Sequence, residues 1–417
     1  MRTVAFHTLG CKVNQYDTQA MLERFQAAGY TVVPFEGPAD VYVLNTCTVT
    51  GTGDKKSMQL TRRLRREHPD SHIVLCGCLA QRKGEELLST GARLVLGTQR
   101  RAEVVELLER AVREKRQLCA VEALTQAPFE RLNITGQQEH TRATLKIQEG
   151  CNNHCTYCII PSVRGPIRSR PLEEIRQEAE RLAGAGFSEL VLTGIHLSSY
   201  GRDVEERPTL LDAIAQVQAV PQVRRIRLGS LEPTIATPSF ASRLKELDKV
   251  CPQFHLALRY NTEMYLTGVE NLRREFPEAA FTTDILTGFP GETEEEYAQT
   301  RHMIEKVGFA KIHVFPYSRR EGTKAAAMPG QLSNAQKEQR ARELIALGEA
   351  VGRRYREGFV GREVEVLLEE PLPNGAWVGY TPEYLRVELP CRNGAQGQYR
   401  RIRAAACTED GLLGEEM

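Results

Sequence analysis

The sequence lacks a long apolar run, an apolar leader and an excess of either charge. No stretch of about 18 apolar residues occurs, so a membrane-spanning helix is excluded by length. The first residues, Met1-Arg-Thr-Val-Ala-Phe-His7, lead directly into a strand pattern, so we expect no signal segment and a cytoplasmic protein. Lysine plus arginine (55) nearly equals aspartate plus glutamate (54), so any nucleic-acid partner must be bound by local basic patches.

Cysteine, in contrast, is abundant. The chain has 11 cysteines, an odd number, in 417 residues. In a reducing compartment they are better explained as metal ligands or small buried side chains than as a disulfide framework. The length predicts two or three compact units.

Three of the cysteines form the most informative motif. Cys151, Cys155 and Cys158 have the spacing C-x3-C-x2-C, which supplies three thiolates. A four-iron cluster held by three thiolates keeps one iron open, and an open iron can bind the amino and carboxylate groups of a small molecule. This pattern is typical of enzymes that cleave S-adenosylmethionine (SAM) by radical chemistry. A three-ligand zinc site and a loop without metal are the alternatives.

The N-terminal part, residues 1–118, alternates short apolar runs with amphipathic helices. This pattern predicts an open α/β domain with a largely parallel sheet, whose strands include residues 3–6, 41–44, 73–75 and 94–96. Cys11, Cys47 and Cys78 each follow a predicted strand. Loops at the carboxyl ends of parallel strands converge, so the three thiols can meet and hold a second cluster. Three unrelated buried cysteines are the alternative.

The central part predicts an incomplete barrel. Residues 119–142 lack a helical or strand period and are interpreted as a linker. Residues 143–350 contain six strand-helix units, which predict a partial parallel (β/α)6 barrel with polar residues at the carboxyl ends of its strands. Gly194 follows one strand, where a small residue lets the backbone approach a cofactor. The predicted strands are residues 144–147, 190–193, 225–228, 254–258, 281–286 and 311–315.

The C-terminal part, residues 351–417, has short alternating strands at residues 364–367, 377–380, 384–389 and 399–403, separated by turns, which predict a small closed β-barrel. It holds nine arginines but eleven acidic residues, so only a one-sided face can bind RNA. We expect Arg400, Arg401 and Arg403 to bind phosphate and Tyr399 to stack a base; a solvated face is the alternative. A second basic run, residues 55–66, lies on a predicted helix of the first domain and has the same alternative.

Together these features resemble the methylthiotransferase family of radical SAM enzymes over nearly the whole chain. Residues 6–17, 147–151 and 192–196 are similar to the branch that acts on threonylcarbamoyladenosine in tRNA. The resemblance implies conversion of N6-threonylcarbamoyladenosine 37 to its 2-methylthio derivative, with a TRAM domain at the C-terminus that binds tRNA. It implies as partners the anticodon stem-loop, an electron-donor protein and a sulfur donor, and no membrane.

The resemblance also implies two 4Fe-4S clusters and SAM. Cys151, Cys155 and Cys158 would hold the SAM-cleaving cluster, and an auxiliary cluster would be held by the cysteines of the first domain, with both open irons facing one cavity. The first domain's strand ends must then point towards the barrel mouth. The implied auxiliary ligands are Cys11, Cys47 and Cys78, with Cys76 a neighbour and Cys119, Cys251, Cys391 and Cys407 matching no ligand position.

Further residues are candidates by position. Tyr157 is expected to pack against the adenine of SAM or only to shield the cluster. Glu232, beside Ser230, is expected to bind ribose hydroxyls or to cap a helix. Asp284 and Thr283 alternate on one strand, so one of them faces inward. Phe315 lines the adenine pocket or fills the core, and Arg164 and Arg168 are expected to meet RNA phosphate or the methionyl carboxylate.

One segment departs from the family pattern. After Leu258 the family has a Gln-Ser-Gly turn and a basic stretch, whereas this sequence continues directly with Arg259. We interpret the difference as a loop absent from the sequence, because a loop between strand and helix at an active site is where disorder is expected. The alternative is an enzyme that has lost a contact to SAM.

Two other functions stay open at this point. A methylthiotransferase acting on isopentenyladenosine in tRNA or on a ribosomal protein would keep both clusters and change only the substrate. A noncatalytic RNA-binding protein with a structural zinc would lack the visible absorbance of an iron-sulfur cluster.

Overall fold

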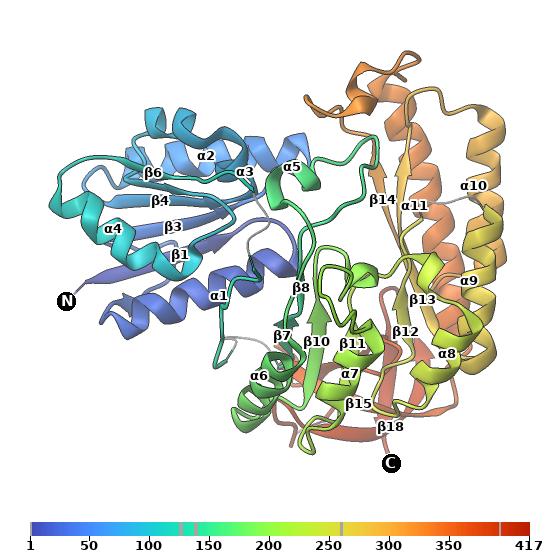
Figure 1. Cartoon of the computed structure of the whole chain (residues 1–417). Helices are drawn as coiled ribbons and strands as arrows, with labels where there is room; N and C mark the ends of the chain where they lie inside the picture. Colours follow the sequence, from blue (N-terminus) through green and yellow to red (C-terminus); the bar gives the residue numbers. More distant parts are fainter. Residues whose placement is uncertain (1, 125–127, 137–140, 259–261, 392) are drawn as a thin grey trace.

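The computed structural model describes residues 2–124, 128–136, 141–258, 262–391 and 393–417. Figure 1 shows an N-terminal α/β domain beside a larger α/β domain, with a small β-barrel packed beneath the larger one. No helix in these ranges is long and apolar enough to span a bilayer. The α/β class and the three architectures predicted from the sequence are confirmed.

The N-terminal domain is built on a six-stranded parallel sheet. Its strands alternate between two cores: Val41 and Val43 face one side, and Tyr42 and Leu44 face the other. Helices α1 (Lys12–Ala27) and α4 (Val104–Arg113) cover the first side, and α2 (Gly51–Glu67) and α3 (Cys78–Lys83) cover the second. The strand order is β2 (Thr31–Val32), β1 (Thr3–Thr8), β3 (Val41–Thr46), β4 (His72–Gly77), β5 (Leu94–Leu96) and β6 (Leu118–Ala120).

The central domain is the expected incomplete barrel. Its six parallel strands form two three-stranded sheets, and isolated parallel bridges, including Leu231 with Leu256, connect the sheets. Helices cover the outside. The strands are β7 (Ala143–Lys146), β10 (Glu189–Thr193), β11 (Arg225–Leu228), β12 (Gln253–His255), β13 (Ala280–Thr287) and β14 (Lys311–Pro316); the helices are α6 (Leu172–Gly184), α7 (Leu210–Gln218), α8 (Pro238–Lys245), α9 (Thr262–Glu275), α10 (Glu294–Val307) and α11 (Asn334–Glu357).

The segment between β6 and β7 has neither helix nor strand in its described residues. It is nevertheless packed, because Phe129, Leu132 and Ile134 are buried. Beyond β7, the two-residue strands β8 (Gln148–Glu149) and β9 (Arg168–Ser169) pair antiparallel, and they enclose the cysteine loop and helix α5 (Ile160–Arg164). The cysteine loop is therefore clamped at its base. The boundaries given above for the domains and the linker stay predictions.

The C-terminal domain is a closed five-stranded barrel. The sequence pattern missed its last strand, which pairs with both β17 and β18 and completes the closure. The strands are β15 (Glu363–Pro371), β16 (Trp377–Tyr380), β17 (Arg386–Leu389), β18 (Tyr399–Cys407) and β19 (Leu412–Glu416).

This barrel docks against the amino ends of β10 and β11. Arg225 Nη2 donates to the carbonyl of Glu365 at 2.9 Å, and Tyr399 is part of the same contact. The guanidinium of Arg224 lies 3.7 Å from the centre of the Tyr399 ring, and Arg225 lies 4.8 Å from it. The expectation that Tyr399 stacks an RNA base is therefore wrong, because two arginines of the central domain cover its ring. Arg401 and Arg403 remain exposed.

Candidate active site

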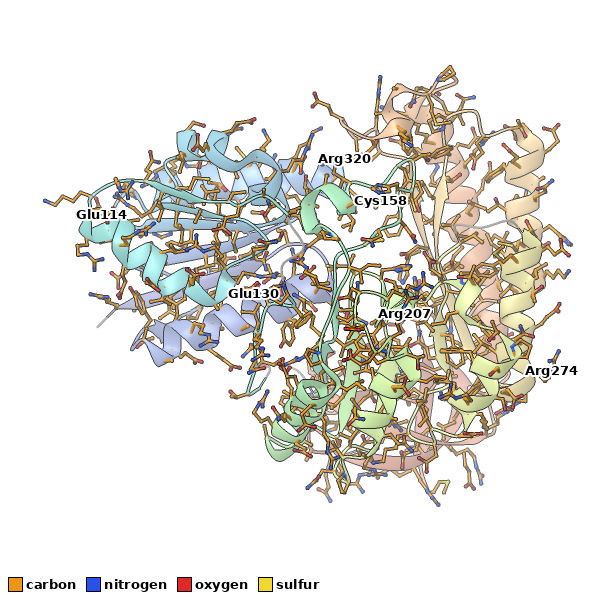
Figure 2. The ribbon with its side chains drawn as sticks, in the orientation of Figure 1. Glu114, Glu130, Cys158, Arg207, Arg274 and Arg320 are labelled. Carbon is orange, nitrogen blue, oxygen red and sulfur yellow. The ribbon has the colours of Figure 1, made fainter. Side chains whose placement is uncertain are left out.

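The C-x3-C-x2-C motif forms a loop between β8 and α5, next to the N-terminal domain (Figures 1 and 2). Cys151 is buried, and the N–H of Asn153 donates to its Sγ at 3.4 Å. The N–H of Cys158 donates to the carbonyl of Cys155 at 3.0 Å. The loop thus directs a backbone donor at a cysteine sulfur, as iron-sulfur sites do.

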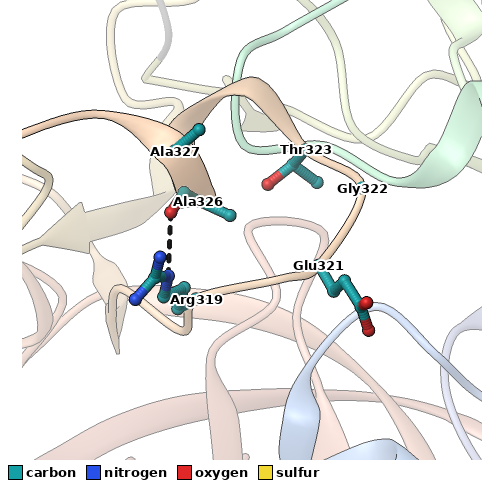
Figure 3. A pocket seen from close by; sticks show the side chains of 6 residues that line it. All are labelled: Arg319, Glu321, Gly322, Thr323, Ala326 and Ala327. Carbon is teal, nitrogen blue, oxygen red and sulfur yellow. Dashed lines mark hydrogen bonds between the residues drawn. The ribbon is translucent and has the colours of Figure 1, made fainter.

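A pocket flanks this loop. Figure 3 shows the pocket, of about 610 Å³, formed by the segment that follows β14. Arg319 Nε donates to the carbonyl of Ala326 at 2.8 Å and closes the segment on itself. In the same segment, the N–H of Ala325 donates to the carbonyl of Thr156 at 2.8 Å. The segment therefore supports the cysteine loop from the barrel side.

Cys11, Cys47 and Cys78 converge at the carboxyl ends of β1, β3 and β4. A Cβ on Gly10 would lie 3.2 Å from Cys47 Sγ, which places the Cys11 turn against Cys47. Burial raises the pKa of Cys78 to about 11; Arg164 opposes the rise, and the charges of Cys11 and Cys47 add to it. The three thiols thus act on one another electrostatically.

This donor set fits an iron-sulfur cluster. The backbone N–H of Val49 hydrogen-bonds Cys47, and Arg164 Nε donates to Cys78 Sγ at 3.2 Å. Such donors to sulfur are characteristic of cluster sites. Within the described ranges, no three His, Cys, Asp or Glu side chains lie close enough to hold a single metal ion. A cluster differs from a single ion because each thiolate binds a different iron, so its ligands stand farther apart.

The two groups of cysteines lie side by side. The side chain of Cys78 packs against Ile159 and Val163, which directly follow the cysteine loop in and around α5. On the other side, Arg320 Nη2 donates to the carbonyl of Thr48 at 2.6 Å, and its Nη1 to Asp54 Oδ2 at 2.9 Å. The strand ends of the N-terminal domain therefore face the barrel mouth, which is the arrangement that two clusters facing one cavity require.

Comparisons with known proteins agree with this geometry. The uncharacterized protein family UPF0004 matches residues 3–97, and the radical SAM superfamily matches residues 145–304. A threonylcarbamoyladenosine tRNA methylthiotransferase, MtaB, of Bacillus subtilis is 40% identical, covering 93% of this chain and 90% of its own length. The chain belongs to the radical SAM methylthiotransferase family. Membership implies a 4Fe-4S cluster and SAM.

Other relatives of this methylthiotransferase carry different names. A tRNA-2-methylthio-N(6)-dimethylallyladenosine synthase of Moorella thermoacetica is 36% identical over 89% of this chain and 88% of its own length. Among solved structures, the radical SAM methyltransferase TsrM of Kitasatospora setae has a TM-score of 0.57 at 14% identity, covering 78% of this chain and 74% of that chain. That likeness concerns the fold alone.

Beside the cysteine loop, Glu232 and His196 form a pair that links neighbouring strand ends of the methylthiotransferase. His196 Nε2 lies 2.8 Å from Glu232 Oε1, and Asn153 Nδ2 of the loop donates to the same oxygen at 3.0 Å. Both paired side chains are buried. Glu232 makes no side-chain cap hydrogen bond to the short helix after it, so its predicted alternative as a helix cap is wrong. Ser230, two residues earlier, is exposed.

His196 ends the segment of residues 192–196 named above, and no partner was predicted for it. The partner, Glu232, follows a different strand. The backbone N–H of His196 donates to Gln148 Oε1 at 2.6 Å. Gly194 explains this contact, because a Cβ there would lie 2.8 Å from Cβ of Gln148. The glycine therefore makes room for Gln148, and its approach to a cofactor stays a prediction.

The concave face of the barrel carries Asp284 and Phe315. Thr283 is fully buried and donates to the carbonyl of Leu256, so Asp284 is the residue of that pair that faces inward. His255 Nε2 lies 3.5 Å from Asp284 Oδ2. Phe315 is 47% exposed, so its alternative role of filling the core is wrong. An exposed aromatic ring on this face is available to a planar ligand.

Tyr157 belongs to a row of aromatic rings at the barrel mouth. Its ring centre lies 6.4 Å from that of Phe289, which in turn lies 5.5 Å from that of Tyr317. Through these ring contacts, the cysteine loop packs against the segments that follow β13 and β14. Contact of Tyr157 with adenine stays a prediction.

Arg164 and Arg168 are buried, so the expectation that they meet RNA phosphate is wrong. Arg164 is enclosed between the two domains by Asp17, Glu149 and Cys78, and the Nη2 of Arg168 donates to the carbonyl of Arg164 at 2.8 Å. Spacing along the chain could not reveal these partners, because Asp17 and Arg164 are brought together only by the docking of the domains.

The remaining cysteines lie elsewhere. The thiol of Cys76 donates to the carbonyl of Leu44 inside the sheet core, and burial raises its pKa to about 12. Cys251 and Cys391 are buried, and Cys119 and Cys407 are half-buried. The interpretation of the Leu258–Arg259 junction concerns residues 259–261, which lie outside the described residues.

Proposed function

We propose that this enzyme converts N6-threonylcarbamoyladenosine 37 of tRNA to its 2-methylthio derivative, in the cytoplasm. The observation that carries the proposal is the packing of Cys78 against Ile159 and Val163, which brings the cysteines of the N-terminal domain next to the C-x3-C-x2-C loop. Two adjacent sulfur-rich sites suit a reaction that must both open an inert C–H bond and deliver sulfur to the same carbon.

Two 4Fe-4S clusters are part of the proposal. Cys151, Cys155 and Cys158 would hold one, and Cys11, Cys47 and Cys78 the other. When bound, these groups supply the electron that cleaves SAM to methionine and a 5′-deoxyadenosyl radical, and the sulfur that is transferred.

The chain's own side chains bind and orient the small molecules. We assign Glu232, near Ser230, to the ribose hydroxyls of SAM, because its carboxylate is held by His196 and Asn153 at the edge of the cysteine loop. Asp284 and Phe315 lie on the concave face, where Phe315 offers a flat apolar surface to an adenine ring and Asp284 accepts hydrogen bonds. Tyr157 and Gly194 border the same mouth of the barrel.

The choice of substrate is supported by four relatives named as threonylcarbamoyladenosine tRNA methylthiotransferases, which are 31 to 40% identical. A second candidate substrate, dimethylallyladenosine in tRNA, is supported by the relative that is 36% identical. A ribosomal protein uS12 methylthiotransferase at 33% identity supports a protein substrate less directly. We also propose that an electron-donor protein and a sulfur donor act with the enzyme.

Nucleoside mass spectrometry tests the proposal. The reconstituted protein is incubated anaerobically with SAM, sulfide, a reductant and tRNA carrying either modified adenosine. We expect a methylthio gain on the threonylcarbamoyl nucleoside, and loss of this gain in Cys78→Ala while SAM cleavage continues. Cys151→Ala is expected to abolish both. Gain on the dimethylallyl nucleoside alone would reassign the substrate, and no gain on either tRNA would contradict the proposal.

A further inference from the structure

Arg164 connects the two groups of cysteines through one side chain. It is the last residue of α5, the helix that begins two residues after Cys158, and it is fully buried. Its Nε donates to Cys78 Sγ at 3.2 Å. A cation and a directed N–H donor thus meet the sulfur of a residue that we assign to the auxiliary cluster.

The rest of the guanidinium is held from both domains. Its Nη1 donates to Asp17 Oδ2 and to both carboxylate oxygens of Glu149, each at 3.1 Å, and its Nη2 donates to Asn14. Asn14 and Asp17 lie on α1, which begins directly after Cys11, and Glu149 lies two residues before Cys151. A displacement of Arg164 would therefore also displace residues next to Cys11 and Cys151, and it would break the hydrogen bond to Cys78.

The charge of Arg164 is not cancelled by one partner. Asp17 also pairs with Lys146 at 2.7 Å and with Arg101, and Glu149 pairs with Lys146 at 2.5 Å. Arg101 also pairs with Glu130 at 2.8 Å, so three carboxylates face the three buried cations, and what Arg164 alone adds is an Nε–H directed at Cys78 Sγ. The direction of Nε is fixed by the four other hydrogen bonds of the same planar group.

We propose that Arg164 is a positioning residue that holds the sulfur of Cys78 against the segment carrying Cys158 and makes the reduction potential of the auxiliary cluster more positive. Hydrogen bonds and positive charge at a cluster sulfur stabilise the reduced, more negative state of the cluster. The inference rests on the proposed function, because it takes Cys78 to be a ligand of that cluster.

The test is a redox titration followed by electron paramagnetic resonance on the full chain. Cys151→Ala, Cys155→Ala and Cys158→Ala are introduced together, so that the signal comes from the auxiliary cluster alone. Into this parent we introduce Arg164→Lys, which keeps the charge but loses the Nε donor. The matched control is Arg101→Lys, which lies in the same buried network without a hydrogen bond to Cys78.

We expect Arg164→Lys to shift the midpoint potential to a more negative value at full iron content, and Arg101→Lys to leave it unchanged. Equal potentials for Arg164→Lys and the parent would overturn the inference alone. An equal shift in both variants would also overturn it, because the effect would then belong to the whole network. If the parent contains no iron, the assignment of Cys11, Cys47 and Cys78 to an auxiliary cluster is wrong, and the inference fails with it.

A second measurement needs no arginine variant. The parent is labelled with 15N-arginine, and the reduced cluster is examined by pulsed resonance for hyperfine coupling to nitrogen. A guanidinium nitrogen that hydrogen-bonds a ligand sulfur is expected to give such a coupling. Its absence would overturn the inference even if Arg164→Lys failed to fold.

Discussion

The carboxylate of Glu232 is held in a fixed position at the barrel mouth, where we propose that it binds a ligand. It is buried, yet it is held by an imidazole and by a side-chain amide from the cysteine loop. A buried carboxylate needs such partners, because an unpaired charge in this position would be strongly destabilised. The same contacts link the position of Glu232 to the loop that carries Cys151 and Cys155.

Replacing Glu232 by Gln is expected to weaken SAM binding about tenfold or more, since a hydrogen bond to a charged group contributes about 1.5–3 kcal/mol. Anaerobic equilibrium dialysis measures the affinity, with Glu246→Gln, an exposed carboxylate, as the control. Iron is measured in parallel. Unchanged affinity at full iron content would contradict the assignment to ribose, and loss of iron would instead assign Glu232 to holding the loop through Asn153.

Asp17 is a buried carboxylate whose ionisation stabilises the contact between domains. Burial alone would raise its pKa, but Arg101, Lys146 and Arg164 outweigh this and lower the pKa below the ordinary value of 3.8. A lowered pKa contributes stability above the unfolded value, and this contribution is lost as the pH falls through the folded value. The contribution is therefore complete at pH 5 to 7 and disappears only in more acidic solution.

We expect Asp17→Asn to lower the free energy of unfolding of cluster-free protein by about 3 kcal/mol at neutral pH, because it leaves buried cations without a partner. The difference from the unmodified chain should stay constant between about pH 7 and 5 and shrink below the unfolded pKa near 3.8. Urea unfolding at several pH values measures it, with exposed Asp70→Asn as the control. A pH-independent difference would show that packing, and not charge, is lost.

The turns that lead from strand to helix in the N-terminal domain place its cysteines. Gly77 is the last residue of β4 and caps α3, with φ of 88°, directly before Cys78. A Cβ there would lie 2.3 Å from Asn45 Oδ1 and 2.6 Å from the carbonyl of Thr46. Both the positive φ and the close approach require glycine.

Gly77→Ala is expected to displace Cys78 and to remove the auxiliary cluster, while SAM cleavage by the other cluster continues. Gly29→Ala is a close control, because Gly29 has φ of 83° but nothing lies within 4 Å of the position that an alanine Cβ would take. Both substitutions carry the strain of a positive φ, and Gly77, with ψ of −159°, lies in a region essentially restricted to glycine, which costs about 1–3 kcal/mol for other residues. Iron per chain and 5′-deoxyadenosine formation are measured. Equal iron content in Gly77→Ala and Gly29→Ala would show that the auxiliary cluster still assembles when Gly77 is replaced.

Local pattern predicted the elements well and the contacts between them poorly. The strands Leu94–Leu96 and Trp377–Tyr380 were expected at these positions, because turns border short apolar or aromatic runs. Strand Leu412–Glu416 was missed, since its sequence does not alternate. Cysteines at predicted strand ends indicated where the site lies. The pairs Arg320–Asp54 and His196–Glu232 join separate elements, so only the folded chain reveals them.

At the scale of the whole molecule, the candidate cluster cysteines and the small β-barrel lie at opposite ends of the central domain. The cysteine loop lies at the carboxyl ends of its strands, whereas the small barrel docks at the amino ends of β10 and β11 through Arg225 and Arg227. A tRNA that places one nucleotide at the barrel mouth must therefore extend along the central domain to reach the small barrel. Because Tyr399 is covered, we expect that contact to depend on charge.

Arg401 and Arg403 are exposed on strand β18 and are available to RNA phosphates. We expect Arg401→Ala with Arg403→Ala to weaken tRNA binding and to reduce the slope of log affinity against log salt by about 0.7 to 0.9 per lost phosphate contact. Filter binding over a series of salt concentrations measures both. Arg353→Ala, an exposed arginine paired with Glu357, controls for the loss of charge alone. SAM cleavage without tRNA should not change, because the cluster loop lies at the far end of the domain. An unaltered salt slope would mean that Arg401 and Arg403 do not contact RNA phosphates. The basic helix α2 (Gly51–Glu67) of the N-terminal domain would then be the next surface to test by charge removal.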